Sequence, residues 1–167
     1  MNQLEKFKDI HTFIFDVDGV MTDSDVLITE SGELLRKMNI RDGYAMKRAI
    51  RDGYRIGIIT GGSSEGVRKR LEALGITDIY VGRFEKMEAF EEFVSKHDLD
   101  PDGILYMGDD VPDYPVMRRV GLPTCPSDAI PEILEFSAYI SPYKGGAGCV
   151  RDVIEKVMRL QGKWSNV

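Results

Sequence analysis

The sequence has few cysteines and no long hydrophobic run. Cys125 and Cys149 lie far apart and without metal-ligand spacing, which argues against a disulfide framework and a zinc site. No apolar run approaches the ~20 residues that a membrane-spanning helix needs. The first ten residues, MNQLEKFKDI, lack the apolar core of a signal peptide. We therefore expect a cytoplasmic protein with reduced thiols and no membrane partner.

An excess of basic residues is also missing. The chain has 22 Lys and Arg against 28 Asp and Glu, a formal net charge of −6, and the two signs are interspersed. This balance argues against nucleic acid as a partner. We find no internal repeat, low-complexity tract or linker, and a chain of this length can bury one sizeable core. We therefore expect residues 1–167 to form a single domain.

Short apolar runs alternate with helical patterns along the chain. The apolar runs predict strands at residues 13–15, 56–59, 79–81, 104–107 and 138–140. Helical spacing predicts helices at residues 64–74, around 87–94, from Pro131 onward, and at 150–158. Strands that alternate with helices in this way predict an α/β fold, a three-layer Rossmann-like parallel sheet with helices on both faces.

One segment interrupts the alternation. Residues 26–29 and 33–39 flank the turn sequence Glu30-Ser31-Gly32, a pattern typical of a β-hairpin. The hairpin, about residues 24–40, precedes a helix that we expect to start near Gly43. It is too short to be a domain, so we interpret it as a flap that projects from the sheet edge.

Polar side chains follow several of the predicted strands or begin the next helix. In chain order they are Asp16, Asp18, Thr60, Lys86, Asp109 and Asp110. Open parallel sheets bind their ligands at the carboxyl ends of the strands. These groups therefore converge if the strands that carry them are neighbours.

Converging carboxylates repel one another unless a cation neutralises them, and hard oxygen ligands favour Mg²⁺. A carboxylate pair such as Asp16 and Asp18 can supply a nucleophile and a proton donor to a phosphate ester. The stretch DVDG alone is equally consistent with an acidic turn. The order and spacing of TGG, Lys86 and GDDVPD behind it favour a phosphate site.

Together these motifs resemble those of the haloacid dehalogenase-like superfamily of phosphotransferases. The motifs are DVDGVMT, the Thr60 of ITGG, Lys86, and GDD followed by Asp113. The resemblance implies that Asp16 attacks phosphorus and forms an aspartyl-phosphate. It implies that Asp18 protonates the leaving oxygen and then deprotonates the hydrolytic water.

The same resemblance implies the phosphate and metal ligands. Thr60 and Lys86 would hold phosphate oxygens. The Asp16 carboxylate, the Asp18 backbone carbonyl and Asp109 would hold Mg²⁺. Asp110 or Asp113 would orient these ligands without binding the metal directly.

The spacing of the motifs leaves no room for a cap domain. Only 43 residues separate Asp16 from Thr60, and 25 separate Thr60 from Lys86. The hairpin and one helix use most of the first interval. An uncapped site stays open to water, so we expect another subunit to cover it.

The finer pattern resembles the cap-less 3-deoxy-D-manno-octulosonate 8-phosphate phosphatase subfamily. The matching stretches are residues 39–47, 75–82, 106–123 and 145–164. The resemblance implies hydrolysis of that sugar acid phosphate in lipopolysaccharide precursor biosynthesis, by a homotetramer whose hairpins form its core. It also implies that the glycine-rich C-terminal segment reaches a neighbouring site. The substrate-binding positions it implies are Asn39, Ile40, Arg41, Asp42, Gly43, Lys47, Gly61 and Arg70.

Two departures from that pattern leave alternatives open. Gly62 and Ala147 stand where many members have arginine, so two cations are missing unless Lys144 or a nearby arginine replaces them. A nine-carbon substrate, 2-keto-3-deoxynononate 9-phosphate, is therefore the closest rival. A non-catalytic tetramerisation module is a second alternative, against which the intact Asp16 and Lys86 argue.

Overall fold

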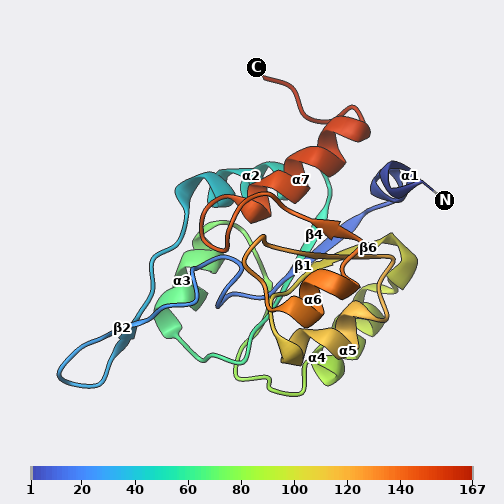
Figure 1. Ribbon diagram of the computed structural model, residues 1–167. Helices are drawn as coiled ribbons and strands as arrows, with labels where there is room; N and C mark the ends of the chain where they lie inside the picture. The colour runs from blue at the N-terminus through green and yellow to red at the C-terminus, as the bar shows by residue number, and fades with distance from the viewer. Residues whose placement is uncertain (1, 167) are drawn as a thin grey trace.

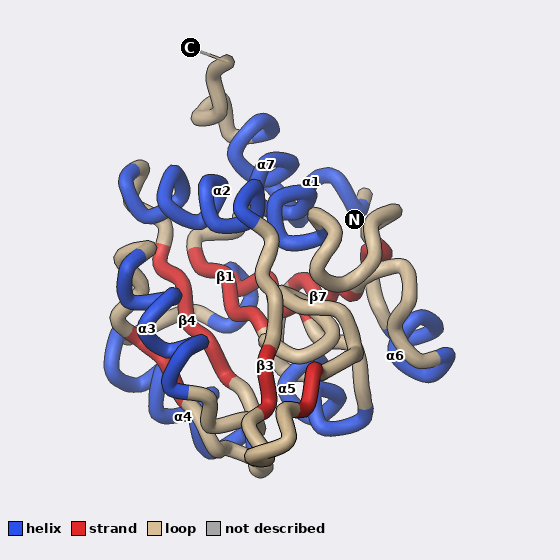
Figure 2. The backbone as a smooth tube through the Cα atoms, turned by 90° about the vertical axis from the view of Figure 1, so that its left-hand side faces the viewer, coloured by secondary structure: helices blue, strands red, loops and turns tan. Residues whose placement is uncertain are grey.

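The computed structural model describes residues 2–166, and its centre is a six-stranded sheet (Figures 1 and 2). The strand order is β5-β4-β1-β6-β7-β8, and every neighbouring pair is parallel. The strands are β1 (Thr12–Phe15), β4 (Arg55–Ile59), β5 (Asp78–Tyr80), β6 (Ile104–Met107), β7 (Leu122–Cys125) and β8 (Tyr139–Ile140). The α/β expectation is confirmed.

Helices cover both faces of this sheet and make three layers (Figure 2). One face carries α1 (Gln3–Lys8), α2 (Ile40–Arg51), α3 (Glu65–Ala73) and α7 (Cys149–Leu160). The other face carries α4 (Lys86–His97), α5 (Tyr114–Met117) and α6 (Pro131–Phe136). Two 3₁₀ turns, η1 (Pro101–Gly103) and η2 (Val111–Asp113), flank β6.

The central strand β1 is buried on both faces. Phe13 and Phe15 pack into the core beneath α2 and α7, whereas Ile14 packs into the core beneath α4. Alternate residues of a strand point to opposite faces, so a short run of apolar residues can serve two cores. Burial of such a side chain stabilises the fold by roughly 1.5–3 kcal/mol. This burial fixes the position at which the chain leaves the sheet after Phe15.

The hairpin lies outside these layers and projects from the molecule (Figure 1). Its strands are β2 (Leu27–Ile28) and β3 (Leu34–Leu35), paired antiparallel. The turn closes with a hydrogen bond from Thr29 N–H to the Glu33 carbonyl. Helix α2 begins at Ile40 and not near Gly43, because the Asn39 side chain accepts hydrogen bonds from two backbone N–H groups of its first turn.

Strand β7, helix α1, the short helix α5 and the two 3₁₀ turns have no counterpart in the sequence-based expectation, and β7 and α1 show why. Strand β7 has the sequence LPTC, and a proline in so short a run argues against a strand that lies inside a sheet. Helix α1 has only six residues, too short for a periodic pattern, and its burial of Phe7 stabilises it. Strand β7 and helix α1 both depend on tertiary packing.

Within residues 2–166 no helix combines the length and the apolar character that a bilayer crossing requires. Cys125 and Cys149 are buried free thiols. The Cys149 Sγ lies 3.1 Å from the Val20 carbonyl oxygen.

The glycine-rich segment before α7 packs against the turn that follows β1. Gly146 N–H donates to the Val20 carbonyl at 3.0 Å. A Cβ atom on Gly145 would lie 2.0 Å from the Gly19 carbonyl oxygen and 2.8 Å from the Thr22 carbonyl oxygen. Only glycine therefore permits this approach, which braces the turn carrying Asp18.

We expect Gly145→Ala to lower the free energy of unfolding by about 1–3 kcal/mol, because the added methyl group forces two backbone segments apart. The matched control is Gly66→Ala in α3, where the nearest atom to an added Cβ lies 3.8 Å away. That change should be neutral or should stabilise by up to about 1 kcal/mol through helix propensity. Urea unfolding of the three proteins measures both effects. Equal stabilities would contradict the bracing role of Gly145.

Candidate active site

Three strand ends bring the expected side chains together. Strand β1 lies between β4 and β6, and Phe15 is in register with Ile58 and Met107. Asp16, Thr60 and Asp109 follow these three strands and line one cavity of about 460 Å³. Asp18, Gly61, Lys86, Asp110 and Asp113 also line it. The convergence expected from the strand order is therefore observed.

A buried lysine joins two carboxylates at the base of the cavity. Lys86 Nζ lies 3.1 Å from Asp16 Oδ1 and 2.7 Å from Asp113 Oδ1, and all three side chains are almost fully buried. Burial acts to lower the pKa of Lys86, but the two carboxylates outweigh it and raise that pKa. The ammonium therefore stays charged beside Asp16.

Asp113 stabilises this arrangement through hydrogen bonds to both of its carboxylate oxygens. Its Oδ1 accepts hydrogen bonds from Lys86 and from the Tyr106 hydroxyl at 2.5 Å. Its Oδ2 accepts from the backbone N–H groups of Asp109, at 2.9 Å, and Asp110, at 3.2 Å. With both oxygens engaged, Asp113 fixes the positions of Lys86, Tyr106 and the backbone at Asp109. The Asp110 side chain caps the 3₁₀ turn η2 instead.

Asp109 offers a free ligand atom. Its Oδ1 is buried and has no hydrogen-bond partner among the described residues. Burial first, and then the charge of Asp113, raise its pKa to about 7. A Cβ on Gly19 would lie 1.9 Å from Asp109 Oδ2, so only glycine lets this carboxylate reach the turn after Asp18.

The carboxylate cluster fits a divalent cation. Asp16, Asp109 and Asp113 place one oxygen each within 4.8 Å of one another. Burial and the charge of Asp113 raise the pKa of Asp16 well above its ordinary value. An orphaned buried oxygen and repelling carboxylates are what a hard cation would satisfy. Because all hydrogen-bonding capacity of Asp113 is already used, Asp16 and Asp109 are the two carboxylates available to hold a cation.

Asp18 lines the same cavity and is contacted from the hairpin by Arg36. Arg36 Nε lies 2.5 Å from Asp18 Oδ1, and Arg36 Nη2 lies 3.2 Å from Asp18 Oδ2. The hydrogen bond to Asp18 raises the pKa of Arg36 above its already high value. No sequence pattern predicts this contact, since it joins residues 18 positions apart through the hairpin.

The loop after β4 forms another wall. The Thr60 hydroxyl accepts a hydrogen bond from Gly62 N–H at 3.2 Å, which tightens the turn. Arg83 and Phe84 close the far side of the cavity, and the Phe84 side chain is 80% exposed. Neither Arg83 nor Phe84 belongs to a motif, and an arginine and an aromatic residue in a loop have no distinctive pattern.

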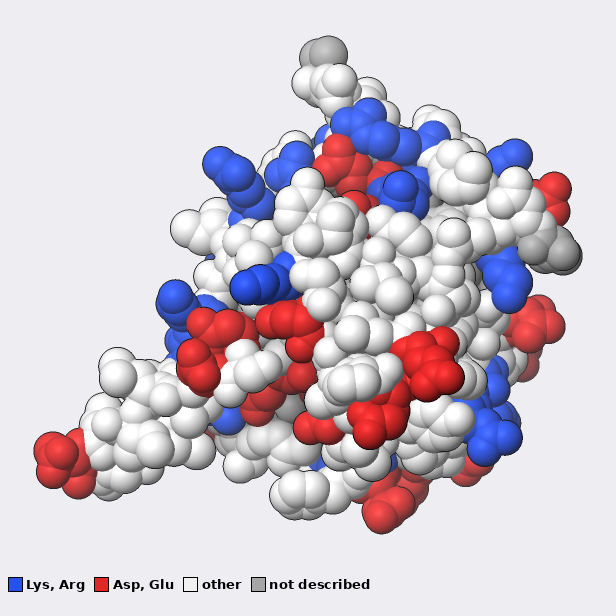
Figure 3. Space-filling model, viewed as in Figure 1, with Lys and Arg blue, Asp and Glu red and all other residues white. Residues whose placement is uncertain are grey.

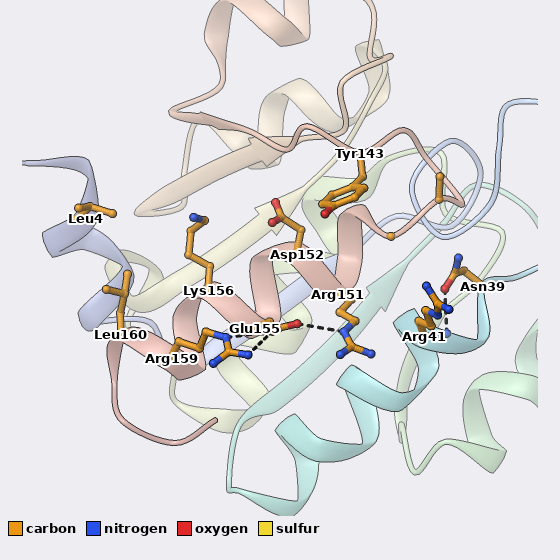
Figure 4. Close-up of a pocket in the computed structure, with 12 residues that line it drawn as sticks. Leu4, Asn39, Arg41, Tyr143, Arg151, Asp152, Glu155, Lys156, Arg159 and Leu160 are labelled. Carbon is orange, nitrogen blue, oxygen red and sulfur yellow. Dashed lines mark hydrogen bonds and ion pairs between the residues drawn. The ribbon is translucent and has the colours of Figure 1, made fainter. Parts of the chain in front are cut away.

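Most positions that the resemblance implies for substrate binding lie elsewhere within this chain. Asn39 and Arg41 line a separate hollow of about 650 Å³ beside α7 (Figure 4). Asp42 is buried and its Oδ1 accepts a hydrogen bond from Arg151 N–H at 2.9 Å. Burial raises the pKa of Asp42 to about 6. Asp42 thus joins the starts of α2 and α7.

The other expected positions are also outside the cavity. Ile40 and Lys47 are exposed on α2, and Gly43 is buried. A Cβ on Gly43 would lie 2.7 Å from Arg70 Nη2. Arg70 lines a shallow groove between the hairpin and α3. Of the eight positions that the resemblance implies for substrate binding, only Gly61 lines the cavity around Asp16.

Charge is unevenly distributed over the molecular surface. Figure 3 shows acidic atoms gathered across the middle and lower part of this face, with basic atoms clustered above them around α7. An anionic substrate that approaches the acidic part needs compensating cations close to the reacting phosphate. Within the cavity those cations are Lys86 and Arg83.

Fold and site together define a class of protein. The parallel sheet places the buried Asp16 after its central strand, and Thr60 and Asp109 after the two flanking strands. Lys86 contacts Asp16 and Asp113. This arrangement is that of a haloacid dehalogenase-like phosphatase. Between β1 and α2 the described chain inserts only the hairpin, so no cap domain is present there.

Comparison with known proteins identifies the family. No family model matches the chain. The 3-deoxy-D-manno-octulosonate 8-phosphate phosphatase of Escherichia coli K12 is 37% identical over 160 residues, 96% of this chain and 85% of the relative. The chain therefore belongs to the 3-deoxy-D-manno-octulosonate 8-phosphate phosphatase family.

Two solved structures agree with that assignment. The phosphatase of this name from Yersinia pestis is 36% identical with a TM-score of 0.93, over 96% of this chain and 86% of that chain. The phosphatase of the same name from Moraxella catarrhalis was solved with magnesium, phosphate and the sugar acid 3-deoxy-D-manno-octulosonate (KDO). It is 30% identical to this chain, with a TM-score of 0.92. That match covers 96% of this chain and 92% of that chain.

We expect Mg²⁺ to raise the unfolding temperature of the protein through Asp16 and Asp109. At a Mg²⁺ concentration of 100 Kd the stabilisation is about 2.7 kcal/mol. Asp109→Asn should lose most of this shift. The control Asp110→Asn removes an equal charge from a side chain that caps η2, and should keep the shift. Thermal unfolding at several Mg²⁺ concentrations measures both.

The Mg²⁺ effect should depend on pH. Because the pKa of Asp109 is raised to about 7, a proton competes with Mg²⁺ below that pH. The metal-free protein loses stability as the pH rises toward 7, since its folded state holds a proton that the unfolded state releases. The Mg²⁺-induced shift should therefore be larger at pH 8 than at pH 6. If the Asp109→Asn protein showed the same Mg²⁺-induced shift as the wild type at both pH values, this assignment would be contradicted.

Proposed function

We propose that the chain is a Mg²⁺-dependent phosphatase that hydrolyses 3-deoxy-D-manno-octulosonate 8-phosphate to the free sugar acid and phosphate. The observation that carries the chemistry is the placement of Asp16 beside Lys86 at the end of β1, with Asp18 two residues further along. Membership of the family supports the substrate. The proposal treats residues 1–167 as one phosphatase domain, and its place in lipopolysaccharide precursor synthesis follows from that substrate.

Asp16 is the nucleophile in this proposal. Its Oδ1 accepts a hydrogen bond from Val17 N–H at 2.7 Å and lies beside Lys86, so the carboxylate is held in one orientation. A carboxylate oxygen bonds to phosphorus as the ester P–O bond breaks, and the bonding pair goes to the leaving oxygen. That oxygen takes a proton from Asp18. The product is an aspartyl-phosphate and the free sugar acid.

The second step reverses the role of Asp18. Asp18 removes a proton from a water molecule, whose oxygen attacks phosphorus and displaces Asp16. Lys86 and the Thr60 loop hold the phosphate oxygens throughout. Mg²⁺, when bound by Asp16, Asp109 and the Asp18 carbonyl, supplies charge neutralisation for the carboxylates and the phosphate. Phosphoryl transfer depends mainly on such positioning and charge neutralisation.

Assembly is part of the proposal because the cavity is open and the hairpin is apolar. Leu27 and Ile28 on one strand and Leu34 and Leu35 on the other are all exposed. The pairs Leu27–Leu35 and Ile28–Leu34 place exposed apolar side chains on both faces of the hairpin, which is typical of a protein–protein contact. We propose that the hairpins pack together in a homotetramer. Asn39, Ile40, Arg41, Asp42, Gly43, Lys47, Arg70 and the glycine-rich segment would then serve a site completed between subunits.

Parallel turnover assays on the eight-carbon and nine-carbon sugar acid phosphates test the substrate. We expect kcat/KM to favour the eight-carbon ester by at least about 10-fold, because a hydrophobic or steric mismatch of one carbon unit costs about 1–3 kcal/mol. Asp16→Asn should lower turnover by about 10³-fold or more without unfolding the protein. Asp23→Asn, another acid close in sequence, is the control and should stay active.

The outcomes separate the alternatives. A preference for the nine-carbon ester would favour the rival substrate, 2-keto-3-deoxynononate 9-phosphate. No phosphate release from either ester or from 4-nitrophenyl phosphate would favour the non-catalytic tetramerisation module. Retained turnover in Asp16→Asn would remove Asp16 as the nucleophile.

Leu27→Asp tests the assembly. The added charge lies on the most exposed apolar side chain of β2 and should shift the mass measured by sedimentation from tetramer toward smaller species. Turnover of the sugar acid phosphate should fall further than turnover of 4-nitrophenyl phosphate, because only the former needs contacts from a neighbour. Glu30→Gln at the hairpin turn is the control. Equal losses on both substrates would argue against a site completed between subunits.

A further inference from the structure

One side chain of the hairpin, that of Arg36, is directed toward Asp18 at the edge of the cavity. Arg36 follows the exposed residues Leu34 and Leu35, yet its side chain is only 10% exposed. The next residue, Lys37, has a side chain that is 90% exposed and approaches Asp23 only to 3.9 Å. Burial of an arginine on an otherwise exposed hairpin requires a specific partner.

That partner is Asp18, which Arg36 contacts through two donors. Nε reaches Oδ1 at 2.5 Å and Nη2 reaches Oδ2 at 3.2 Å. A guanidinium that meets a carboxylate through two parallel hydrogen bonds fixes both the position and the plane of the carboxylate. The Asp18 side chain is 42% exposed, so surrounding packing alone does not hold it.

The loop after β4 leaves the space that the guanidinium occupies. A Cβ on Gly62 would lie 3.4 Å from Asp18 Oδ2 and 3.5 Å from Arg36 Nη2. Thr60, Ser64 and Val67 line the same small space, which contains almost no free volume. The Arg36 side chain is therefore enclosed between the Thr60 loop, the start of α3 and the turn that carries Asp18.

We infer that Arg36 is a positioning residue for Asp18 and that the hairpin thereby sets the geometry of proton transfer to the leaving oxygen. The inference rests on the proposed function, which makes Asp18 the proton donor. A displacement of a catalytic group by about 1 Å can cost about 10²-fold in rate. Arg36 thus connects the hairpin, which is expected to form the subunit contact, with Asp18, the proposed proton donor.

A merely structural role for Arg36 predicts a different result. If Arg36 only anchors the hairpin, its loss should affect all phosphate esters equally. If Arg36 positions the proton donor, its loss should affect an ester in proportion to how much its leaving oxygen needs a proton. Phenyl phosphate and 4-nitrophenyl phosphate differ little in size, but phenolate is the poorer leaving group. The two esters therefore separate these roles without involving sugar recognition.

The experiment measures kcat/KM of the full chain with Mg²⁺ on a series of substituted phenyl phosphates. We expect Arg36→Ala to reduce kcat/KM by about 10²-fold for phenyl phosphate, the usual contribution of general acid catalysis. The reduction for 4-nitrophenyl phosphate should be only a few-fold, so the dependence on leaving-group pKa becomes steeper. Arg36→Lys keeps the charge without the two-donor geometry and should fall between. Lys37→Ala, on the same hairpin, should match the wild type.

The comparison uses the ratio of kcat/KM for two esters within each variant. A smaller fraction of active protein lowers both values equally and leaves this ratio unchanged. Sedimentation of the variants checks that their assembly is unchanged. Arg36→Ala should also add little to Asp18→Asn, since the positioned group is then already disabled. An equal reduction across the series, or additive effects of the two changes, would overturn the inference. A wild-type protein that hydrolyses none of the esters would overturn the proposed function and this inference with it.

Discussion

The site depends on one buried contact, the ammonium of Lys86 between Asp16 and Asp113. Three carboxylates meet at the ends of β1 and β6, and burial raises the pKa of Asp16 and Asp109. A single lysine offsets part of that repulsion, and the Tyr106 hydroxyl and two backbone N–H groups saturate Asp113. What remains uncompensated is the charge at Asp16 and Asp109, and a divalent cation supplies the missing balance. The need for a metal ion thus follows from the carboxylates that come directly after β1 and β6.

The sequence was sufficient to predict the centre of this arrangement, because its signals are local. A run of apolar residues that ends in DVDG marks both a buried strand and its carboxyl end, and the same holds for the strands that precede Thr60 and Asp109. The parallel α/β pattern then requires that these ends share one edge. The order β4-β1-β6 could not be read from periodicity, yet it is what brings the three side chains together. The contact of Tyr106 with Asp113 could not be predicted either. A tyrosine within a strand is expected in the core whether or not its hydroxyl has a hydrogen-bond partner.

Contacts that join distant segments could not be predicted from the sequence. Arg36 reaches Asp18 only because the hairpin folds back over the Thr60 loop, and nothing in the pattern around Arg36 distinguishes it from Lys37. The positions taken from family resemblance show the opposite difficulty. Asn39, Arg41 and Asp42 match the family motif, but within one chain they cap α2, line a hollow beside α7 and join α2 to α7. A motif identifies which residues matter, and only the assembled structure says which chain's site they serve.

The hairpin links these two parts of the molecule. A cap domain would shield the site and orient the substrate, and this chain has a short hairpin in that place. The hairpin has apolar side chains on its exposed strands and one arginine directed inward, so the surface suited to a neighbouring subunit and the contact to Asp18 lie within nine residues of each other. Any force that repositions the hairpin must therefore move the Arg36 guanidinium, and with it the plane of the Asp18 carboxylate. In the proposed tetramer the orientation of Asp18, the proposed proton donor, would therefore depend on assembly without an additional domain.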